Sequence, residues 1–304
     1  MNAVLIIDKP SGMTSHDVVN RVRRILQERS VGHLGTLDPL ATGVLPLVMG
    51  NLTRLAQFYT SSEKIYEGVI RFGFATDTYD AQGEPTSPMS QVTISLDELH
   101  SLAGQFRGHI QQIPPPFSAK KIQGVPAYKL ARKQKEVRLD PVQVEIKEFD
   151  ILSAEGDCAS FRARVASGTY MRSIAHDLGQ KLGCGAHLQS LRRTAVAEFD
   201  ISQAHTLERV EATAAQGDAN ELFVHPRRLL PELPSVTATE EVTALIRNGR
   251  TVTLPDLSKA RQVKVFRGQG ELIAIATRIA GTLFHPGIVL AVDAAREPTR
   301  SASF

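Results

Sequence analysis

The chain of 304 residues carries 35 Lys and Arg against 32 Asp and Glu, and this net charge of +3 is too small to identify a polyanion-binding protein by itself. At about 150 residues per domain, the length predicts two domains. The two cysteines, Cys158 and Cys184, are too few for a disulfide framework or a zinc cage, so we expect reduced thiols. No apolar stretch approaches a membrane span, and the apolar run at residues 3–7 lacks the basic region of a secretory leader. We therefore expect a soluble, cytoplasmic protein that no membrane anchors.

The first third of the chain predicts alternating strands and helices. Residues 3–7 are continuously apolar, which indicates a buried strand. Thr14 and Asp17 have capping-box spacing before apolar residues at helical intervals, so a helix is expected to follow. Residues 43–49 then read as a strand, 51–59 as a helix, and 64–76 as a strand with one face formed by Tyr66, Gly68, Ile70, Phe72 and Phe74. A second capping-box pair, Ser95 and Glu98, predicts a short helix before the prolines at 114–116.

Residues 118–138 form a cationic segment. Glu136 is its only acid, and its positive residues are Lys120, Lys121, Lys129, Arg132, Lys133, Lys135 and Arg138. A glycine and a proline precede a helical-looking stretch within it, and we expect a mobile excursion from the fold. Such a segment could contact phosphates, or it could be a solvated face.

The rest of the chain predicts more strands and a second domain. Strands are expected at residues 142–152 and 158–167, and a helix at 171–182. Two prolines within residues 230–236 indicate a domain boundary. Short strands expected at 262–266, 271–276 and 288–292 then predict a small β domain.

A single carboxylate, Asp38, lies in the glycine-rich stretch of residues 32–50. Pro39 biases Asp38 toward extended geometry, and Gly35 and Gly43 permit backbone angles that other residues resist. The carboxylate should therefore be displayed on a loop. An ordinary turn is the alternative, because Asp-Pro commonly begins one.

The motifs of several chemistries are absent from the sequence. It contains no GxxxxGK[ST] phosphate loop, no HExxH helix and no GxSxG nucleophile elbow. One loop carboxylate suits attack on a sugar carbon or proton abstraction from one, because an ionised carboxylate can do either without a metal. It would need a nearby cation to stay ionised. Arg172, in the stretch GTYMRSI at residues 168–174, is a candidate for that cation, and an exposed arginine at a helix start is the alternative.

The stretch GHLGTLDPLATG at residues 32–43 resembles the catalytic loop of the TruB family of tRNA pseudouridine synthases. This resemblance implies that Asp38 is the catalytic aspartate and that His33 is a substrate-binding histidine. GTY-x-R resembles a second motif, which implies that Arg172 pairs with Asp38 and that Tyr170 lies in the pocket.

Two further motifs extend the resemblance. Tyr66, in KIY at residues 64–66, matches the tyrosine that stacks on the target base in the family. GAHLQSLRRT at residues 185–194 resembles the segment in which a leucine lines the uracil pocket, which implies that role for Leu191. The arginines after it, Arg192 and Arg193, could lie near RNA or near the fold's own carboxylates.

The resemblance also implies the fold. It predicts an α+β protein with a mixed, largely antiparallel sheet in a catalytic domain at residues 1–232. FSAKKIQGVPAY resembles a thumb-like RNA-binding insertion, expected at about residues 112–140, in which Lys120, Lys121 and Lys129 would contact RNA phosphates. Residues 233–304 resemble a PUA domain, a small barrel-like RNA-binding module.

The activity that the resemblance implies is isomerisation of uridine 55 in the T-loop of tRNA to pseudouridine, with base flipping and without cofactor or metal. We expect a monomer that binds the T-arm. A non-catalytic tRNA-binding chaperone with the same fold is the first alternative, and it would not need Asp38. A sugar hydrolase is the second, and it would need paired carboxylates, for which only Asp80 offers a partner.

Overall fold

The computed structural model describes residues 1–118, 120–122, 124–131, 133, 137, 139–255 and 258–291. The helix expected after Thr14 is present as α1 (Ser15–Leu26), and its capping box is confirmed by a bond from the Asp17 amide to Thr14 Oγ1 and one from the Thr14 amide to Asp17 Oδ2. Before and after α1 lie β1 (Ala3–Lys9), β2 (Val31–His33) and β3 (Thr42–Met49). The segment expected as a helix at 51–59 is the 3-10 helix η1 (Gly50–Tyr59).

The middle of the chain confirms the expected elements with two corrections. β4 (Lys64–Phe72) ends four residues before the expected 76, because Gly73 turns the chain at a φ of 101° and Phe74 therefore leaves the ladder. α2 (Leu96–Gly104) forms where expected, but the Ser95 side chain makes no capping bond. The elements that follow are β5 (Gly108–Gln112), β8 (Val142–Glu155), β9 (Cys158–Val165), α4 (Met171–Leu182), β10 (Ala186–Val196) and β11 (Phe199–Asp200).

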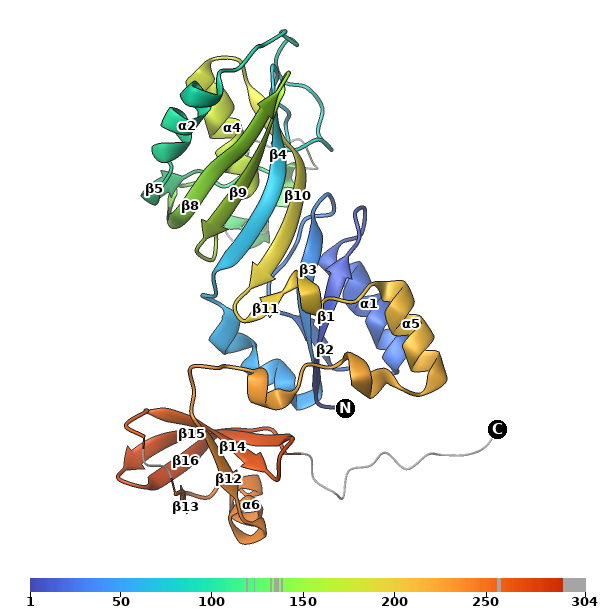
Figure 1. Ribbon diagram of the computed structural model, residues 1–304, viewed down its shortest axis with the longest axis vertical. Helices are drawn as coiled ribbons and strands as arrows, with labels where there is room; N and C mark the ends of the chain where they lie inside the picture. The colour runs from blue at the N-terminus through green and yellow to red at the C-terminus, as the bar shows by residue number, and fades with distance from the viewer. Residues whose placement is uncertain are drawn as a thin grey trace.

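Among the described residues, one sheet of nine strands runs in the order β1-β3-β10-β4-β9-β8-β5, with β2 beside β3 and β11 beside β10. Its pairs are antiparallel except for β3 and β10, where Gly43 lies opposite Arg193 in a parallel ladder. This short parallel seam divides the sheet into a half with β1 to β3 and a half with β4, β5, β8 and β9 (Figure 1). The expected mixed, largely antiparallel sheet is confirmed.

One face of this sheet is covered by helices. α1 and α5 (Leu207–Gln216) cover the β1–β3 half, and α2 and α4 cover the other half (Figure 1). Side chains from all four helices join a single core cluster with the sheet, including Val18, Val210, Leu99 and Ile174. Short 3-10 helices at Ile201–Gln203, Ala219–Leu222 and Pro226–Arg228 lead from β11 toward the C-terminal part.

The C-terminal part forms a curled sheet in the order β12-β14-β15-β16-β13, with α6 (Glu240–Arg247) beside it. Its strands are β12 (Ser235–Ala238), β13 (Val252–Thr253), β14 (Gln262–Arg267), β15 (Glu271–Ala280) and β16 (Leu283–Val289). The strand expected at 288–292 was misplaced. Pro286 lies inside β16 at a register shift, where a residue without an N–H is tolerated, rather than in a turn before it.

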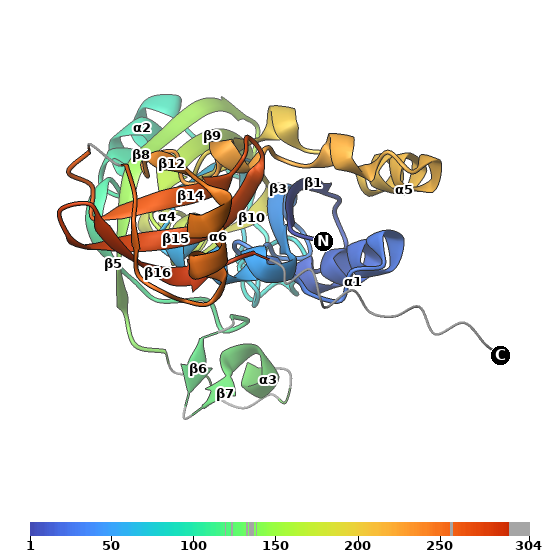
Figure 2. The same cartoon turned by 90° about the horizontal axis from the view of Figure 1, so that it is seen from below.

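The cationic segment stands out from the body as β6 (Lys121–Ile122), β7 (Val125–Pro126) and α3 (Ala127–Ala131) (Figure 2). Ala127 is buried, and its amide donates to the Lys120 carbonyl, so part of the expected excursion has regular structure. Arg132, Lys135, Glu136 and Arg138 lie outside the described residues. Within the part of the chain that the structure describes, no helix has both the length and the apolar character needed to cross a bilayer.

Candidate active site

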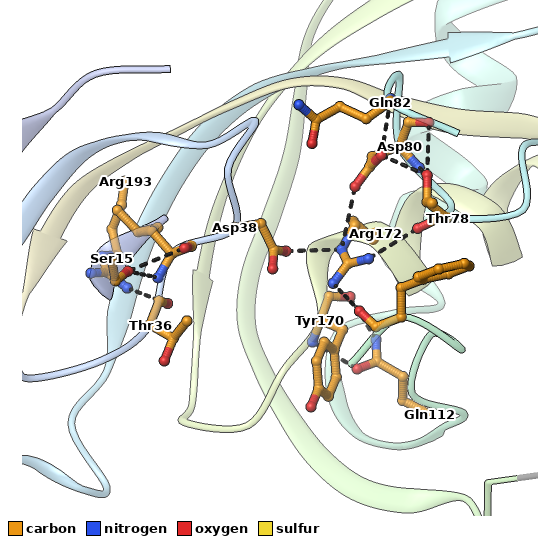
Figure 3. A network of polar contacts seen from close by, with 12 residues as sticks. Ser15, Thr36, Asp38, Thr78, Asp80, Gln82, Gln112, Tyr170, Arg172 and Arg193 are labelled. Carbon is orange, nitrogen blue, oxygen red and sulfur yellow. Dashed lines mark hydrogen bonds and ion pairs between the residues drawn. The ribbon is translucent and has the colours of Figure 1, made fainter. Parts of the chain in front are cut away.

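The candidate site lies at the parallel seam of the large sheet. Asp38 belongs to the loop between β2 and β3, which ends where β3 meets β10. Arg172 is in the first turn of α4, from the other half of the sheet. The two halves therefore each contribute one charged residue to a site between them (Figure 3).

Asp38 and Arg172 form an ion pair with 2.9 Å between Arg172 Nε and Asp38 Oδ2. The N–H of Nε is not aligned on a hydrogen-bond acceptor among the described residues, so attraction between charges holds this contact. The Arg172 side chain is 6% exposed and the Asp38 side chain 42%, so the cation is enclosed while the carboxylate faces the open side. Arg172 also donates to the carbonyls of Thr78, at 3.1 Å, and Phe117, at 3.0 Å.

A second carboxylate, Asp80, approaches the same nitrogen of the Arg172 guanidinium (Figure 3). Its Oδ2 is 3.7 Å from Arg172 Nε, and its side chain is only 6% exposed. Asp80 Oδ1 accepts bonds from the Thr78 hydroxyl, at 2.6 Å, and the Gln82 amide, at 3.0 Å. Asp80 is thus fixed and enclosed, and it helps to compensate the buried charge of Arg172.

The backbone of the Asp38 loop ahead of Asp38 is held by two buried side chains, Arg193 and Ser15. Arg193, fully buried, donates to the carbonyls of Gly35, at 3.0 Å, and Thr36, at 3.2 Å. The buried Ser15 hydroxyl accepts from the Leu37 amide at 2.8 Å and donates to its carbonyl at 3.1 Å.

The backbone carbonyls of Asp38 and of the residue after it also accept hydrogen bonds. The Asp38 carbonyl accepts from the Ala41 amide, and the Pro39 carbonyl accepts from both the Gly12 amide and Lys9 Nζ. Every carbonyl from residue 35 to 39 therefore has a partner, and the loop holds its carboxylate in one place. Lys9 is fully buried, which lowers its pKa to about 8, while the nearby Asp38 charge opposes that shift.

Tyr170 is fixed through its backbone by Gln112, a buried residue at the end of β5. The Tyr170 amide donates to Gln112 Oε1 at 2.8 Å, and Gln112 Nε2 donates to the Tyr170 carbonyl at 3.1 Å. Burial raises the pKa of the Tyr170 phenol, with a smaller contribution in the same direction from Asp38 and opposite ones from Ser118 and Arg172. The phenol is therefore protonated at neutral pH.

The other expected site residues border the loop. His33 Nδ1 accepts a bond from the Gly35 amide at 3.3 Å, and burial together with Arg193 lowers the pKa of His33, so the ring is neutral with its proton on Nε2. Tyr66, on β4 and 7% exposed, lies opposite Arg193 in the β4–β10 ladder. Leu191, on β10 and 9% exposed, lies opposite Gly68 of β4.

Of the two arginines after Leu191, Arg193 holds the Asp38 loop, whereas Arg192 and the lysines of the cationic segment lie elsewhere. Arg192 forms a two-bond pair with Asp8, at 3.0 Å and 2.7 Å, and so meets one of the fold's own carboxylates. Lys120 and Lys129 are exposed on the projecting segment, and the backbone of Lys121 is in β6. This segment starts directly after Phe117, whose carbonyl is bound by Arg172.

The sequence reasoning missed Ser15, Lys9 and Gln112, and it assigned Asp80 only to a rival activity. Ser15, Lys9 and Gln112 each bind a backbone group at least 22 positions away, and no local pattern marks such a contact. Together the site offers one half-exposed carboxylate on a braced loop, a buried cation beside it and a neutral phenol. No group of three or more His, Cys, Asp or Glu side chains is placed for metal binding within the described ranges.

Comparison with known proteins identifies the family. Residues 23–171 match the TruB family pseudouridylate synthase N-terminal domain, and residues 172–232 match the tRNA pseudouridylate synthase B C-terminal domain. The chain is 51% identical over 293 residues to tRNA pseudouridine synthase B of Solibacter usitatus, covering 95% of this chain and 100% of that protein. It is 39% identical to the protein of the same name from Stutzerimonas stutzeri, covering 90% of this chain and 91% of the other.

Solved structures share the fold at lower identity. One is an H/ACA RNP bound to a substrate RNA containing 2′-deoxyuridine, with a TM-score of 0.70, 23% identity, and coverage of 95% of this chain and 85% of that chain. An archaeal box H/ACA sRNP Nop10-Cbf5 complex gives a TM-score of 0.68 at 24% identity, covering 95% and 86%. With relatives of this similarity along almost its whole length, the chain belongs to the TruB family of pseudouridylate synthases.

Proposed function

We propose that this protein isomerises uridine 55 in the T-loop of tRNA to pseudouridine, with Asp38 as the catalytic residue. The observation that carries the proposal is the Asp38–Arg172 pair, which presents a half-exposed carboxylate from a braced loop in a chain of this family. The curated relatives bear the name tRNA pseudouridine synthase B, which supports tRNA as the substrate.

The chemistry exchanges one bond to the ribose for another. Asp38 attacks C1′ or removes a proton from the sugar, and the bond from C1′ to N1 of the uracil breaks. The base turns, C5 bonds to C1′, and the proton on C5 is released to solvent while N1 gains one. Nothing is oxidised or reduced, and no group is lost. Arg172 keeps Asp38 ionised and oriented during these steps.

The roles proposed for the remaining site residues follow from the resemblance to the family. Tyr66 stacks on the target base, an interaction of about 1–3 kcal/mol that offsets part of the cost of flipping it. Leu191 lines the uracil pocket beside it. Tyr170, protonated at neutral pH, is able to exchange a proton with the base. His33, neutral and with Nε2–H free of the Gly35 contact, offers a donor to the RNA at the edge of the loop.

The RNA is held by parts outside the catalytic pair. In this proposal residues 1–232 form the catalytic domain, the projecting segment within residues 112–140 closes on the T-arm, and residues 233–304 form a PUA-like module that grips RNA. Lys120, Lys121 and Lys129 contact phosphates. We also propose that the protein acts as a monomer; Asp38 and Arg172 come from one chain, so their pairing needs no second copy.

The sugar-hydrolase alternative finds no support at Asp80. A glycosidase needs two carboxylates that reach the sugar, whereas Asp80 is 6% exposed and both of its oxygens already have partners.

Tritium release from tRNA labelled at uridine C5 tests the proposal. The native protein should release tritium, and Asp38→Asn, which keeps the shape and removes the charge, should release none while still binding tRNA. Asp218→Asn makes the same chemical change at an exposed position after α5 and should leave release unchanged. Tight binding without release by the native protein would instead identify a tRNA-binding chaperone.

A further inference from the structure

Tyr79 lies in the loop that holds Arg172 and has a backbone conformation that is unusual for its type. Its φ is 64°, in the left-handed region, at a cost of about 1–2 kcal/mol for a residue with a Cβ. The residue before it, Thr78, accepts a bond from Arg172, and the residue after it, Asp80, places its carboxylate 3.7 Å from the same guanidinium. Tyr79 is therefore one residue away from two groups that touch the partner of Asp38.

The loop around Tyr79 is also held by hydrogen bonds to its backbone. The Tyr79 carbonyl accepts from the Leu188 amide of β10 at 3.0 Å, and the Leu188 carbonyl accepts from the Ala81 amide at 3.0 Å. The Thr76 hydroxyl donates to the Asp80 carbonyl at 2.7 Å. These bonds hold the left-handed turn, which leaves Thr78 and Asp80 on Arg172 while the Tyr79 ring lies against α4.

The Tyr79 ring stacks on the imidazole of His176, with the ring centroids 3.8 Å apart and the planes 11° from parallel. His176 follows Arg172 by one turn of α4, so the two lie on the same face of that helix. Within the described residues, His176 Nδ1 is buried without a hydrogen-bond partner, so stacking rather than a hydrogen bond orients this ring. Both residues are only partly buried.

The stacked pair is uncharged at neutral pH. Burial raises the pKa of the Tyr79 phenol, as does Asp177, and burial lowers the pKa of the His176 imidazole. Two neutral, partly exposed aromatic rings, one stacked on the other, suit contact with a nucleobase and do not attract a phosphate.

We propose that Tyr79, supported from beneath by His176, is a stacking site for a second unpaired nucleobase of the RNA, one close in sequence to the target uridine. The inference rests on the proposed function, because it takes the target nucleotide to lie at Asp38, and Arg172 contacts both Asp38 and the neighbours of Tyr79. Tyr79 would then bind a base next to the target uridine and help to hold the RNA loop open around that uridine.

The test combines protein variants with T-arm RNAs that each lack one base within two positions of the target. Tyr79→Leu removes the aromatic ring and keeps the same backbone strain, since both side chains are unbranched at Cβ. It should weaken binding of the intact T-arm about 5- to 50-fold, whereas Tyr79→Phe should bind within about twofold of the native protein. His176→Leu, which removes the supporting ring, should weaken binding in the same direction.

The decisive result is non-additivity. The native protein should bind one of the abasic RNAs, the one that lacks the stacked base, about 5- to 50-fold more weakly than the intact T-arm. For that RNA, Tyr79→Leu should weaken binding by no more than about a further twofold. Circular dichroism checks that Tyr79→Leu and His176→Leu are folded. If these variants weaken the binding of every abasic RNA by the same factor as that of the intact T-arm, or weaken the binding of no RNA, the stacking site is excluded. Tritium release by the native protein from the intact T-arm is measured in parallel. Its absence would contradict the proposed function, while its presence with additive effects would overturn only the stacking site.

Discussion

At the scale of single residues, the site depends on side chains that hold backbone groups. Lys9 is the clearest case, because its buried Nζ donates to the carbonyls of Pro10, Met13 and Pro39. The last of these follows Asp38 directly. Lys9 therefore joins the end of β1 to the Asp38 loop, and burial lowers its pKa to about 8 from 10.5.

This shift predicts a pH dependence of stability. Between pH 8 and about 10.5 the unfolded chain keeps the Lys9 proton and the folded chain releases it, so the free energy of unfolding rises with pH across that window. Between pH 7 and pH 10 the free energy of unfolding of the native protein should rise by about 2–3 kcal/mol more than that of Lys9→Met. Urea unfolding of both proteins at the two pH values measures this. Lys64, whose pKa burial also lowers to about 8, is present in both and cancels. If the difference in free energy of unfolding between the two proteins does not change with pH, the pKa of Lys9 is not lowered by folding.

The sequence could predict the proposed catalytic pair, Asp38 and Arg172, but not the residues that support it. Asp38 and Arg172 lie in short motifs that resemble the family's, and the structure places them 2.9 Å apart. Ser15 binds a residue 22 positions away and Gln112 one 58 positions away. Arg193 reaches 158 positions back to Gly35. No local pattern encodes such partners, because the tertiary fold alone brings them to the loop.

At the scale of elements, the sequence predicted most strands and helices and misjudged several ends. α4 was predicted with its observed bounds, and Gly183, with a φ of 75°, ends it as the C-cap residue. β4 and β16 were misjudged at a glycine and a proline, because such residues end strands in some contexts and are accommodated in others. Gly73 turns the chain out of the sheet, whereas Pro286 sits at a bulge within β16.

Gly43 shows how one residue permits the seam on which the site is built. It has a φ of 99°, and a Cβ added there would lie 2.2 Å from the Arg193 carbonyl oxygen. Gly43→Ala should therefore lower the free energy of unfolding by roughly 3 kcal/mol or more, because the β3–β10 ladder would have to separate. Gly104→Ala is the matched control, since this glycine ends α2 with open space around its Cβ position, and it should be neutral or stabilising by up to about 1 kcal/mol. Thermal unfolding measures both variants. If Gly43→Ala and Gly104→Ala change stability equally, β3 and β10 do not approach each other closely at Gly43.

At the scale of the whole molecule, the curled C-terminal sheet is fixed to the rest. Leu272, Ile275 and Leu290 share a core cluster with Val4 and Ile6 of β1. The segment that joins the two sheets is also held from both sides. Lys264 of β14 donates to the Leu229 carbonyl at 2.7 Å, and Glu198 accepts from the Leu230 amide at 2.9 Å and from the Tyr59 hydroxyl at 2.6 Å. RNA would thus meet one body with a projecting segment at its side (Figure 2).

The projecting segment carries a concentration of charge that the net charge of +3 does not reveal. If its lysines bind phosphates, each contact releases counterions, and the dependence of affinity on salt counts those contacts. The triple variant Lys120→Ala, Lys121→Ala and Lys129→Ala should bind tRNA more weakly and should flatten the plot of log affinity against log salt by about two to three units of slope. Filter binding between 50 and 200 mM salt, as a rough working range, measures both quantities. Lys181→Ala removes a positive charge at the other end of α4, where Lys181 contacts Gln105 near α2, and it should leave the slope unchanged. A triple variant with the native slope would show that this segment does not contact the RNA backbone, whatever its effect on catalysis.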